Sequence, residues 1–202
     1  MLGKGSFGAV YLVKMKTTGE YYAMKVLSKS MVISQNLSKY VYTERNVQSE
    51  IRHNFIVKLH CAFQSKDKLY MVMDYCKGGD LGHLLQKKGK LSEDVARIYL
   101  AEVLLAIEEL HSREIIYRDL KPDNVAIDED GHAMLIDFGL SKEGIKGTEF
   151  TQSFCGSVAY LAPEILRRSG HGRTVDWYLL GVLLYEMLVG IPPYFDRDKY
   201  FH

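Results

Sequence analysis

Two short apolar runs near the middle of the chain form the pattern around which the rest of the sequence can be arranged. Residues 125–127 and 133–136 are rich in side chains that favour β-strands, and the segment between them, 128–131, reads Asp-Glu-Asp-Gly, which is turn chemistry. The pattern predicts an antiparallel hairpin. Asn124 precedes the first strand and Asp137 follows the second, so we expect them side by side at its open end.

Strand patterns dominate the first part of the chain and helical periodicity dominates the rest. Strands are predicted at residues 9–14, 21–27, 54–63 and 69–75, and helices at 37–51, 92–111 and 176–189. The change of pattern falls at residues 76–80, Cys-Lys-Gly-Gly-Asp, where two glycines loosen the chain. We therefore expect two lobes, residues 1–76 and 77–202, within one domain that spans residues 1–202.

Two charged residues lie on faces that are otherwise apolar. Lys25 shares a strand face with Ala23 and Leu27, and Glu44 lies within the apolar stripe of the helix predicted at 37–51. A surface lysine with its ammonium in water is the alternative for Lys25. Because a carboxylate on an apolar face also needs a partner, the sequence favours an ion pair between Lys25 and Glu44.

Composition narrows the class of protein. With 202 residues, of which 47% are hydrophobic, the chain can bury a core, and a formal net charge of +1 indicates neither a nucleic-acid partner nor membrane insertion. Its three cysteines are odd in number and lack metal-ligand spacing, which favours reduced thiols. The N-terminus has no signal-peptide pattern, and the apolar stretch 178–189 is short and contains Glu186. We therefore expect a soluble cytoplasmic or nuclear protein.

The chain begins with a glycine pattern, G-x-G-x-x-G-x-V, formed by Gly3, Gly5, Gly8 and Val10 after Leu2. Glycines let backbone amides approach phosphate oxygens without interference from a Cβ. A dinucleotide-binding fold uses similar spacing, but it needs a preceding strand and a helix directly afterwards. Here two predicted strands follow, so the sequence favours a strand-turn-strand lid over phosphates.

Two segments near the centre of the chain resemble protein kinase motifs. Residues 117–124, Tyr-Arg-Asp-Leu-Lys-Pro-Asp-Asn, resemble the catalytic loop, and residues 137–139, Asp-Phe-Gly, resemble the DFG element. Residues 162–164, Ala-Pro-Glu, are similar to the end of the kinase activation segment. An acidic surface turn would account for the first motif alone, but it leaves the others unexplained.

Further segments are similar to the AGC group of serine/threonine kinases, which includes the cyclic-nucleotide-dependent and Akt-like kinases. They are the Thr-Glu-Arg-Asn run at 43–46, the Tyr before Arg118 and the Phe-Cys-Gly-Ser run at 154–157. Val158-Ala159 departs from the Pro-Glu that this group usually carries, which leaves the peptide specificity open. The resemblance implies an α+β, two-lobed fold, with a small antiparallel β lobe containing one helix and a mainly helical large lobe.

The resemblance covers nearly the whole chain, and it implies that the kinase pattern continues beyond both ends. The sequence is therefore interpreted as a domain truncated before Met1 and after His202. In relatives, Glu164 pairs with an arginine from a late helix. We expect the 202-residue chain by itself to be a poor kinase, because that carboxylate would lack its partner.

The resemblance also implies a role for individual residues. The catalytic set is Asp119 as the base, Lys121 on the γ-phosphate, and Lys25 held by Glu44 on the α- and β-phosphates. Asn124 and Asp137 would hold Mg²⁺, whose preferred ligands are hard oxygens. The residues implied in ATP binding are Leu2, Gly3, Gly5, Gly8, Val10, Ala23, Lys25, Met73, Asp74, Cys76, Asp80 and Ala126. Ala126 is smaller than the usual leucine, so the floor beneath adenine would be looser.

Substrate and regulatory positions follow from the same resemblance. Asp80, Asp123 and Glu186 match positions at which carboxylates face arginines before the target residue. For Asp80, a helix N-terminal carboxylate in water is the alternative. Ser153 matches a regulatory phosphosite to which an upstream kinase would add a phosphate. That phosphate could pair with Arg118 and Lys142, and an unmodified loop serine is the alternative.

The implied function is a protein serine/threonine kinase that uses ATP and Mg²⁺ and acts on protein substrates in arginine-rich contexts. A pseudokinase scaffold or an inactive kinase fragment is the rival interpretation. Its usual sign is loss of the lysine, the catalytic aspartate or the metal aspartate, and Lys25, Asp119 and Asp137 are all present. A small-molecule kinase is less favoured, because an activation segment that runs through Glu164 is typical of protein kinases.

Overall fold

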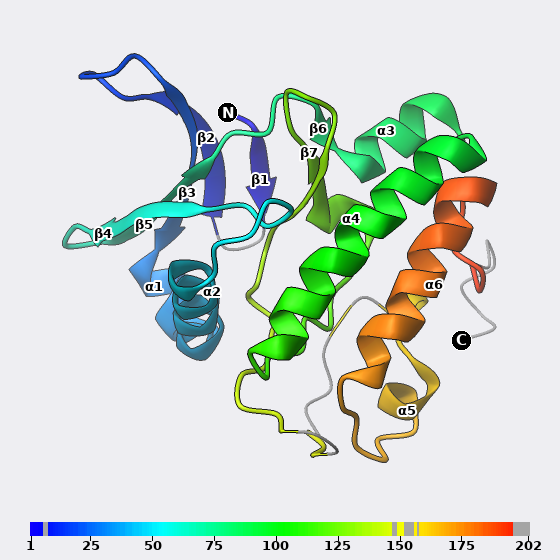
Figure 1. Cartoon of the computed structure of the whole chain (residues 1–202). Helices are drawn as coiled ribbons and strands as arrows, with labels where there is room; N and C mark the ends of the chain where they lie inside the picture. The colour runs from blue at the N-terminus through cyan, green and yellow to red at the C-terminus, as the bar shows by residue number, and fades with distance from the viewer. Residues whose placement is uncertain (6–7, 147–148, 152–155, 157, 196–202) are drawn as a thin grey trace.

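The computed structural model of the chain describes residues 1–5, 8–146, 149–151, 156 and 158–195 (Figure 1). The first part is a five-stranded antiparallel sheet in the order β1-β2-β3-β5-β4. Its strands are β1 (Gly3–Gly5), β2 (Gly8–Lys14), β3 (Tyr21–Ser28), β4 (Leu59–Gln64) and β5 (Lys68–Asp74). Two helices, α1 (Lys29–Ser34) and α2 (Ser38–Glu50), join β3 to the segment before β4.

The rest of the chain is mainly helical, which confirms the expected α+β class. Its helices are α3 (Leu81–Lys88), α4 (Glu93–Ser112), α5 (Pro163–Leu166) and α6 (Thr174–Val189), with 3-10 turns at Pro122–Asn124 and Val158–Tyr160. A small antiparallel sheet of β6 (Gly79–Asp80), β7 (Val125–Ile127) and β8 (Ala133–Leu135) lies between the larger sheet and these helices (Figure 1). No helix in the described ranges is long and apolar enough to cross a membrane.

The hairpin predicted from the central apolar runs is confirmed. β7 pairs with β8, with Val125 opposite Leu135 and Ile127 opposite Ala133. At the open end the Ile136 N–H donates to the Asn124 carbonyl at 3.0 Å. Asn124 and Asp137 therefore leave the hairpin on adjacent strands, as the alternation of strand and turn residues predicted.

Two expectations about the first part of the chain were wrong in detail. The strand predicted at 54–63 begins only at Leu59, because the backbone of residues 55–57 bonds to Leu135 of β8 instead of pairing with β5. This segment packs as a loop against β8, where the Val57 N–H donates to the Leu135 carbonyl at 3.0 Å. Besides the expected helix, the structure contains α1, whose six residues are too few to establish a helical pattern.

The core of the helical part lies between α4 and α6, which run side by side in Figure 1. Its members share the inward faces of these helices and are Ala96, Val103, Ala106, Ile107, Leu110, Leu179, Leu180, Leu183 and Met187. Ser92 takes the predicted N-cap position of α4, but its side chain makes no capping hydrogen bond. The loop from residue 115 to 124 connects α4 to β7, so the packed helix fixes where that loop starts.

Candidate active site

The predicted ion pair forms between β3 and α2. Lys25 lies opposite Val10 of β2 and Met71 of β5, and its Nζ is 2.5 Å from Oε1 of Glu44, whose side chain is 5% exposed. Burial alone would lower the pKa of Lys25, but the carboxylates of Glu44 and Asp137 outweigh this effect and raise it. The lysine is therefore held in its charged form, facing the site.

The loop before β7 presents a carboxylate with two hydrogen-bond donors. Oδ2 of Asp119 accepts from Nζ of Lys121 at 3.0 Å and from Nδ2 of Asn124 at 2.8 Å, and Asn124 also donates to the Asp119 carbonyl at 2.7 Å. Burial raises the pKa of Asp119, and the charge and hydrogen bond of Lys121 only partly oppose it. A carboxylate with these properties is suited to accept a proton.

A second carboxylate, Asp176, anchors this loop and was not identified from the sequence. Its Oδ1 accepts from the Arg118 N–H at 2.8 Å, and its Oδ2 accepts from the Tyr117 N–H at 2.9 Å and from Nε2 of His111 at 2.7 Å. Arg118 has a φ of +71°, a conformation that is strained for a residue with a Cβ. The one sequence feature that could have indicated this role was the presence of an aspartate in the first turn of a strongly apolar helix, where a carboxylate needs a partner.

The two residues expected to hold a metal offer an amide and a carboxylate oxygen. Asp137 has a φ of +58°, its side chain is 49% exposed, and its Oδ1 accepts from the Gly139 N–H at 3.2 Å and lies 3.9 Å from Nζ of Lys25. Among the described residues, no group of three or more histidine, cysteine, aspartate or glutamate side chains could hold a metal by itself. Asn124 and Asp137 fit Mg²⁺, which usually takes one or two protein oxygens and completes its shell with phosphate and water.

The strand-turn-strand predicted from residues 9–14 and 21–27 is formed by β2 and β3, which pair with Val10 opposite Lys25. The glycine-rich start adds a strand that the sequence did not predict, β1, which pairs with β2, and Ser6-Phe7 lie outside the described residues. Gly3 pairs with Val10 and Gly5 with Gly8, and the Leu2 N–H donates to the Val10 carbonyl at 2.8 Å. A Cβ on Gly8 would lie 2.1 Å from the Val26 carbonyl oxygen, so only glycine fits there.

The other residues expected around a nucleotide lie at the end of β5 and in β7. Ala23 pairs with Met73, and the Asp74 carboxylate accepts hydrogen bonds from a backbone N–H before β4 and from a histidine ring on β4. Burial, together with nearby carboxylates, raises the pKa of the Cys76 thiol to about 12, so it is protonated at neutral pH. Ala126 is buried between β6 and β8.

Comparison with known proteins decides the family. The protein-family model described as "Protein kinase domain" matches residues 1–202 of the chain. The chain belongs to the protein kinase family. It is 50% identical over 199 residues to the RAC family serine/threonine-protein kinase homolog of Dictyostelium discoideum, covering 98% of this chain and 45% of that protein.

Further relatives are also AGC-group serine/threonine kinases. Serine/threonine-protein kinase Sgk3 of Rattus norvegicus is 49% identical over 199 residues, and Serine/threonine-protein kinase sgk-1 of Caenorhabditis elegans is 48% identical over 198 residues. Each alignment covers 98% of this chain, and the chain spans less than half the length of these relatives, 40% and 43% respectively. The family implies ATP, typically with Mg²⁺, and protein substrates.

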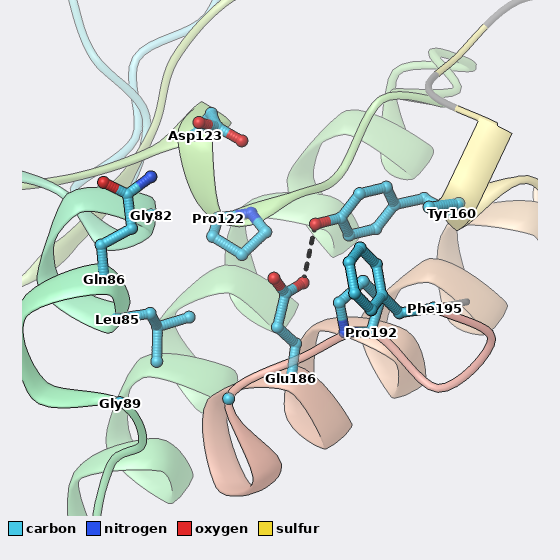
Figure 2. A pocket seen from close by; sticks show the side chains of 12 residues that line it. Gly82, Leu85, Gln86, Gly89, Pro122, Asp123, Tyr160, Glu186, Pro192 and Phe195 are labelled. Carbon is cyan, nitrogen blue, oxygen red and sulfur yellow. Dashed lines mark hydrogen bonds between the residues drawn. The ribbon is translucent and has the colours of Figure 1, made fainter. Parts of the chain in front are cut away.

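Two of the acidic residues expected to bind substrate line one cavity of this kinase domain. Asp123, from the 3-10 turn at Pro122–Asn124, and Glu186, from α6, border a cavity of about 530 Å³ (Figure 2). The Tyr160 hydroxyl donates to Oε2 of Glu186 at 2.8 Å. Burial raises the pKa of Glu186 and the charge of Asp123 raises it further, while the hydrogen bond from Tyr160 opposes both.

The third expected substrate residue, Asp80, has a structural role that its sequence position left open. Its Oδ1 accepts from the His83 N–H at 2.7 Å and caps the N-terminus of α3. It nevertheless lies close to the cavity, which Gly82 of α3 lines. A Cβ placed on Gly82 would be 3.2 Å from Oδ1 of Asp80 and 3.1 Å from Oδ1 of Asp123. The fold therefore brings these acidic residues to one side of α3.

Arg118, expected to receive a regulatory phosphate, is buried. Its Nε donates to the Leu140 carbonyl at 2.8 Å and its Nη2 to the Ser141 carbonyl at 3.4 Å. It also lines a second cavity of about 280 Å³ together with Lys142. Ser153, the expected phosphosite, lies outside the described residues.

Proposed function

We propose that this protein kinase domain transfers the γ-phosphoryl group of ATP to serine or threonine hydroxyls of protein substrates. The observation that carries the proposal is that the Lys25–Glu44 pair lies beside Asp137, while Asp119 accepts a hydrogen bond from Asn124. The Asn124 carbonyl in turn accepts from the N–H of Ile136, the residue before Asp137. The relatives named above are serine/threonine kinases, which supports the same reaction. Phosphoryl transfer depends mainly on positioning and on neutralising charge, and these residues supply both.

In this mechanism Asp119 orients the substrate hydroxyl and accepts its proton, since its carboxylate is held by Lys121 and Asn124. Lys121 then contacts the γ-phosphate and Lys25 the α- and β-phosphates. Asn124 and Asp137 would hold Mg²⁺, which when bound neutralises charge on the phosphate oxygens. The residues of β1 and β2 would cover the phosphates, and Val10, Ala23 and Ala126 would enclose adenine.

Substrates with arginine before the target residue fit the acidic cavity. Asp123 and Glu186 border it and Asp80 lies close by. Planar guanidinium groups bind carboxylates in paired hydrogen bonds, so arginine should be preferred over lysine. A positional peptide library should enrich arginine ahead of Ser or Thr, whereas indifference to arginine would contradict this assignment.

Regulation by an upstream kinase at Ser153 is also part of the proposal. Lys142 and Arg118 border a cavity that is also lined by Thr151, two residues before Ser153 in the chain, and their positive charge would favour a phosphate there. Ser153→Ala should lower turnover, and a variant equal to the wild type at saturating ATP would contradict the assignment.

The reaction itself is tested by transfer of radiolabelled phosphate from ATP to generic basic peptides. The wild-type protein should transfer label to Ser or Thr, and Asp119→Asn should not, although it still binds nucleotide. A wild-type protein that binds ATP without transferring phosphate would instead support the rival interpretation, a pseudokinase scaffold or an inactive kinase fragment. Label that appears only on small-molecule acceptors would contradict a protein kinase activity.

A further inference from the structure

A carboxylate from α4 holds the β7–β8 hairpin and has no place in the mechanism above. Glu102 is 6% exposed. Its Oε2 accepts from the N–H of Ala133, the first residue of β8, at 2.7 Å, and its Oε1 is 2.6 Å from Nδ1 of His132. Because an ionised carboxylate only accepts hydrogen bonds, the histidine nitrogen is the donor.

The burial of Glu102 explains why both of its donors, the Ala133 N–H and the His132 ring, matter. A buried carboxylate is costly unless its oxygens are paired, and here each oxygen has one donor. The His132 ring is 53% exposed, so solvent protons reach it, and its centroid is 6.1 Å from that of Phe55. We call the contacts of Glu102 with the Ala133 N–H and the His132 ring the clamp. Its backbone partner cannot change charge, whereas its histidine partner can.

The clamp acts on the strand that leads to Asp137. Ala133 begins β8, and Asp137 follows four residues later, about 13 Å away at roughly 3.3 Å per residue. Between them, the Leu135 N–H donates to the Phe55 carbonyl at 2.8 Å and the Ile136 N–H donates to the Asn124 carbonyl at 3.0 Å. Ala133 is thus connected through β8 to both residues that offer oxygens for a metal.

We propose that Glu102 is a positioning residue for phosphoryl transfer. Through Ala133 and His132 it sets the position of the β7–β8 hairpin, and the charge on His132 tunes how firmly the hairpin is held. This inference rests on the proposed function, because the hairpin matters by carrying Asn124 and Asp137.

The charged groups around His132 determine the direction of its pH response. Glu102 faces it from α4, and Asp128 and Asp130 face it from the turn between β7 and β8. Oδ1 of Asp128 also accepts from the backbone N–H of His132 at 2.8 Å. The hydrogen bond with Glu102, followed by its charge, raises the pKa of His132, and the two aspartates add to the effect. A raised histidine pKa means that the ion pair is complete at low pH and weakens as pH rises through that pKa.

The test uses Glu102→Gln and His132→Gln, with Glu108→Gln, an exposed glutamate of the same helix, as the matched control. Hydrogen exchange of the Ala133 amide in nucleotide-free protein reports the clamp, and the KM for Mg·ATP and kcat, measured across neutral pH, report its effect on the site. Glu102→Gln should speed Ala133 exchange and raise the KM for Mg·ATP by roughly tenfold. His132→Gln should remove the pH dependence of the Ala133 protection factor, which is the measured exchange rate corrected for the intrinsic rate at each pH, and the change of KM with pH that exceeds that of Glu108→Gln.

The inference is overturned if Glu102→Gln matches Glu108→Gln in KM at every pH, whatever its thermal stability. Should Glu102→Gln fail to fold, His132→Gln decides, and a pH dependence of the Ala133 protection factor equal to that of the wild type overturns the clamp. A wild-type protein that transfers no phosphate would refute the proposed function instead. In that case Ala133 exchange and Mg·ATP binding still test the clamp, and faster exchange with weaker binding in Glu102→Gln would support it.

Discussion

Replacing Asp176 with alanine tests how the catalytic loop is held. The side chain is completely buried and accepts three hydrogen bonds, two from the N–H groups of Tyr117 and Arg118 and one from His111. A buried donor that loses its partner costs about 1–3 kcal/mol, and bonds to a charged acceptor are at the stronger end. With two buried backbone donors and a histidine affected, we expect Asp176→Ala to lower the free energy of unfolding by roughly 3–5 kcal/mol.

Because Arg118 has a left-handed backbone, loss of the hydrogen bonds to Asp176 should also lower turnover. A non-glycine residue at positive φ costs about 1–2 kcal/mol, so without Asp176 this residue should relax toward an ordinary conformation. Asp119 is the next residue, and its carboxylate would move away from Lys121. Turnover should therefore fall strongly while the KM for ATP changes less, because Lys25 and Glu44 lie on other elements.

Urea unfolding followed by circular dichroism measures the stability change, with Asp94→Ala as the control. Asp94 is an exposed aspartate of α4 that pairs with Arg97 at the surface, and such pairs contribute about 0–1 kcal/mol. If Asp176→Ala lost less than about 1 kcal/mol, no more than the control, these hydrogen bonds would not be what orders the loop.

Four further predictions concern the reacting and substrate-binding residues. Lys25→Met should abolish phosphate transfer in a chain that still folds, which transfer assays and thermal melting check together. Asp137→Asn should weaken Mg·ATP binding, whereas Asp119→Asn should lower turnover and leave nucleotide affinity nearly unchanged; equal loss of affinity, measured by calorimetry, would contradict these roles. Because burial raises the pKa of Asp119, activity should fall with decreasing pH above the ordinary aspartate range, about 3.9, and a pH profile of kcat/KM shows whether it does. The preference for arginine should likewise be lost as pH falls through the raised pKa of Glu186, and Tyr160→Phe should move that loss to higher pH, as peptide competition at several pH values would reveal.

Much of the local architecture and the central ion pair could be predicted from the sequence. The β7–β8 hairpin follows from strand residues on both sides of turn residues, which depend on neighbours only. Lys25 and Glu44 were paired correctly across 19 residues because each is a charge on an otherwise apolar face and each needs a partner. Periodicity also located α2, α4 and α6, with boundaries within a few residues.

Tertiary structure decided which distant residues share a site. Asp176 bonds to backbone groups 58 and 59 residues earlier, and Glu102 reaches His132 across 30 residues. Nothing in the local spacing of these residues indicates their partners, because the contacts depend on how α4 and α6 pack against the loop and the hairpin. Asp80 differs, because its partner is only three residues away and the sequence already offered a helix N-terminal carboxylate as one of two alternatives; the structure shows that its carboxylate caps α3. Sequence pattern thus determined the elements and the charges that need partners, and packing determined the partners, because burial makes unpaired polar groups costly wherever the chain brings them.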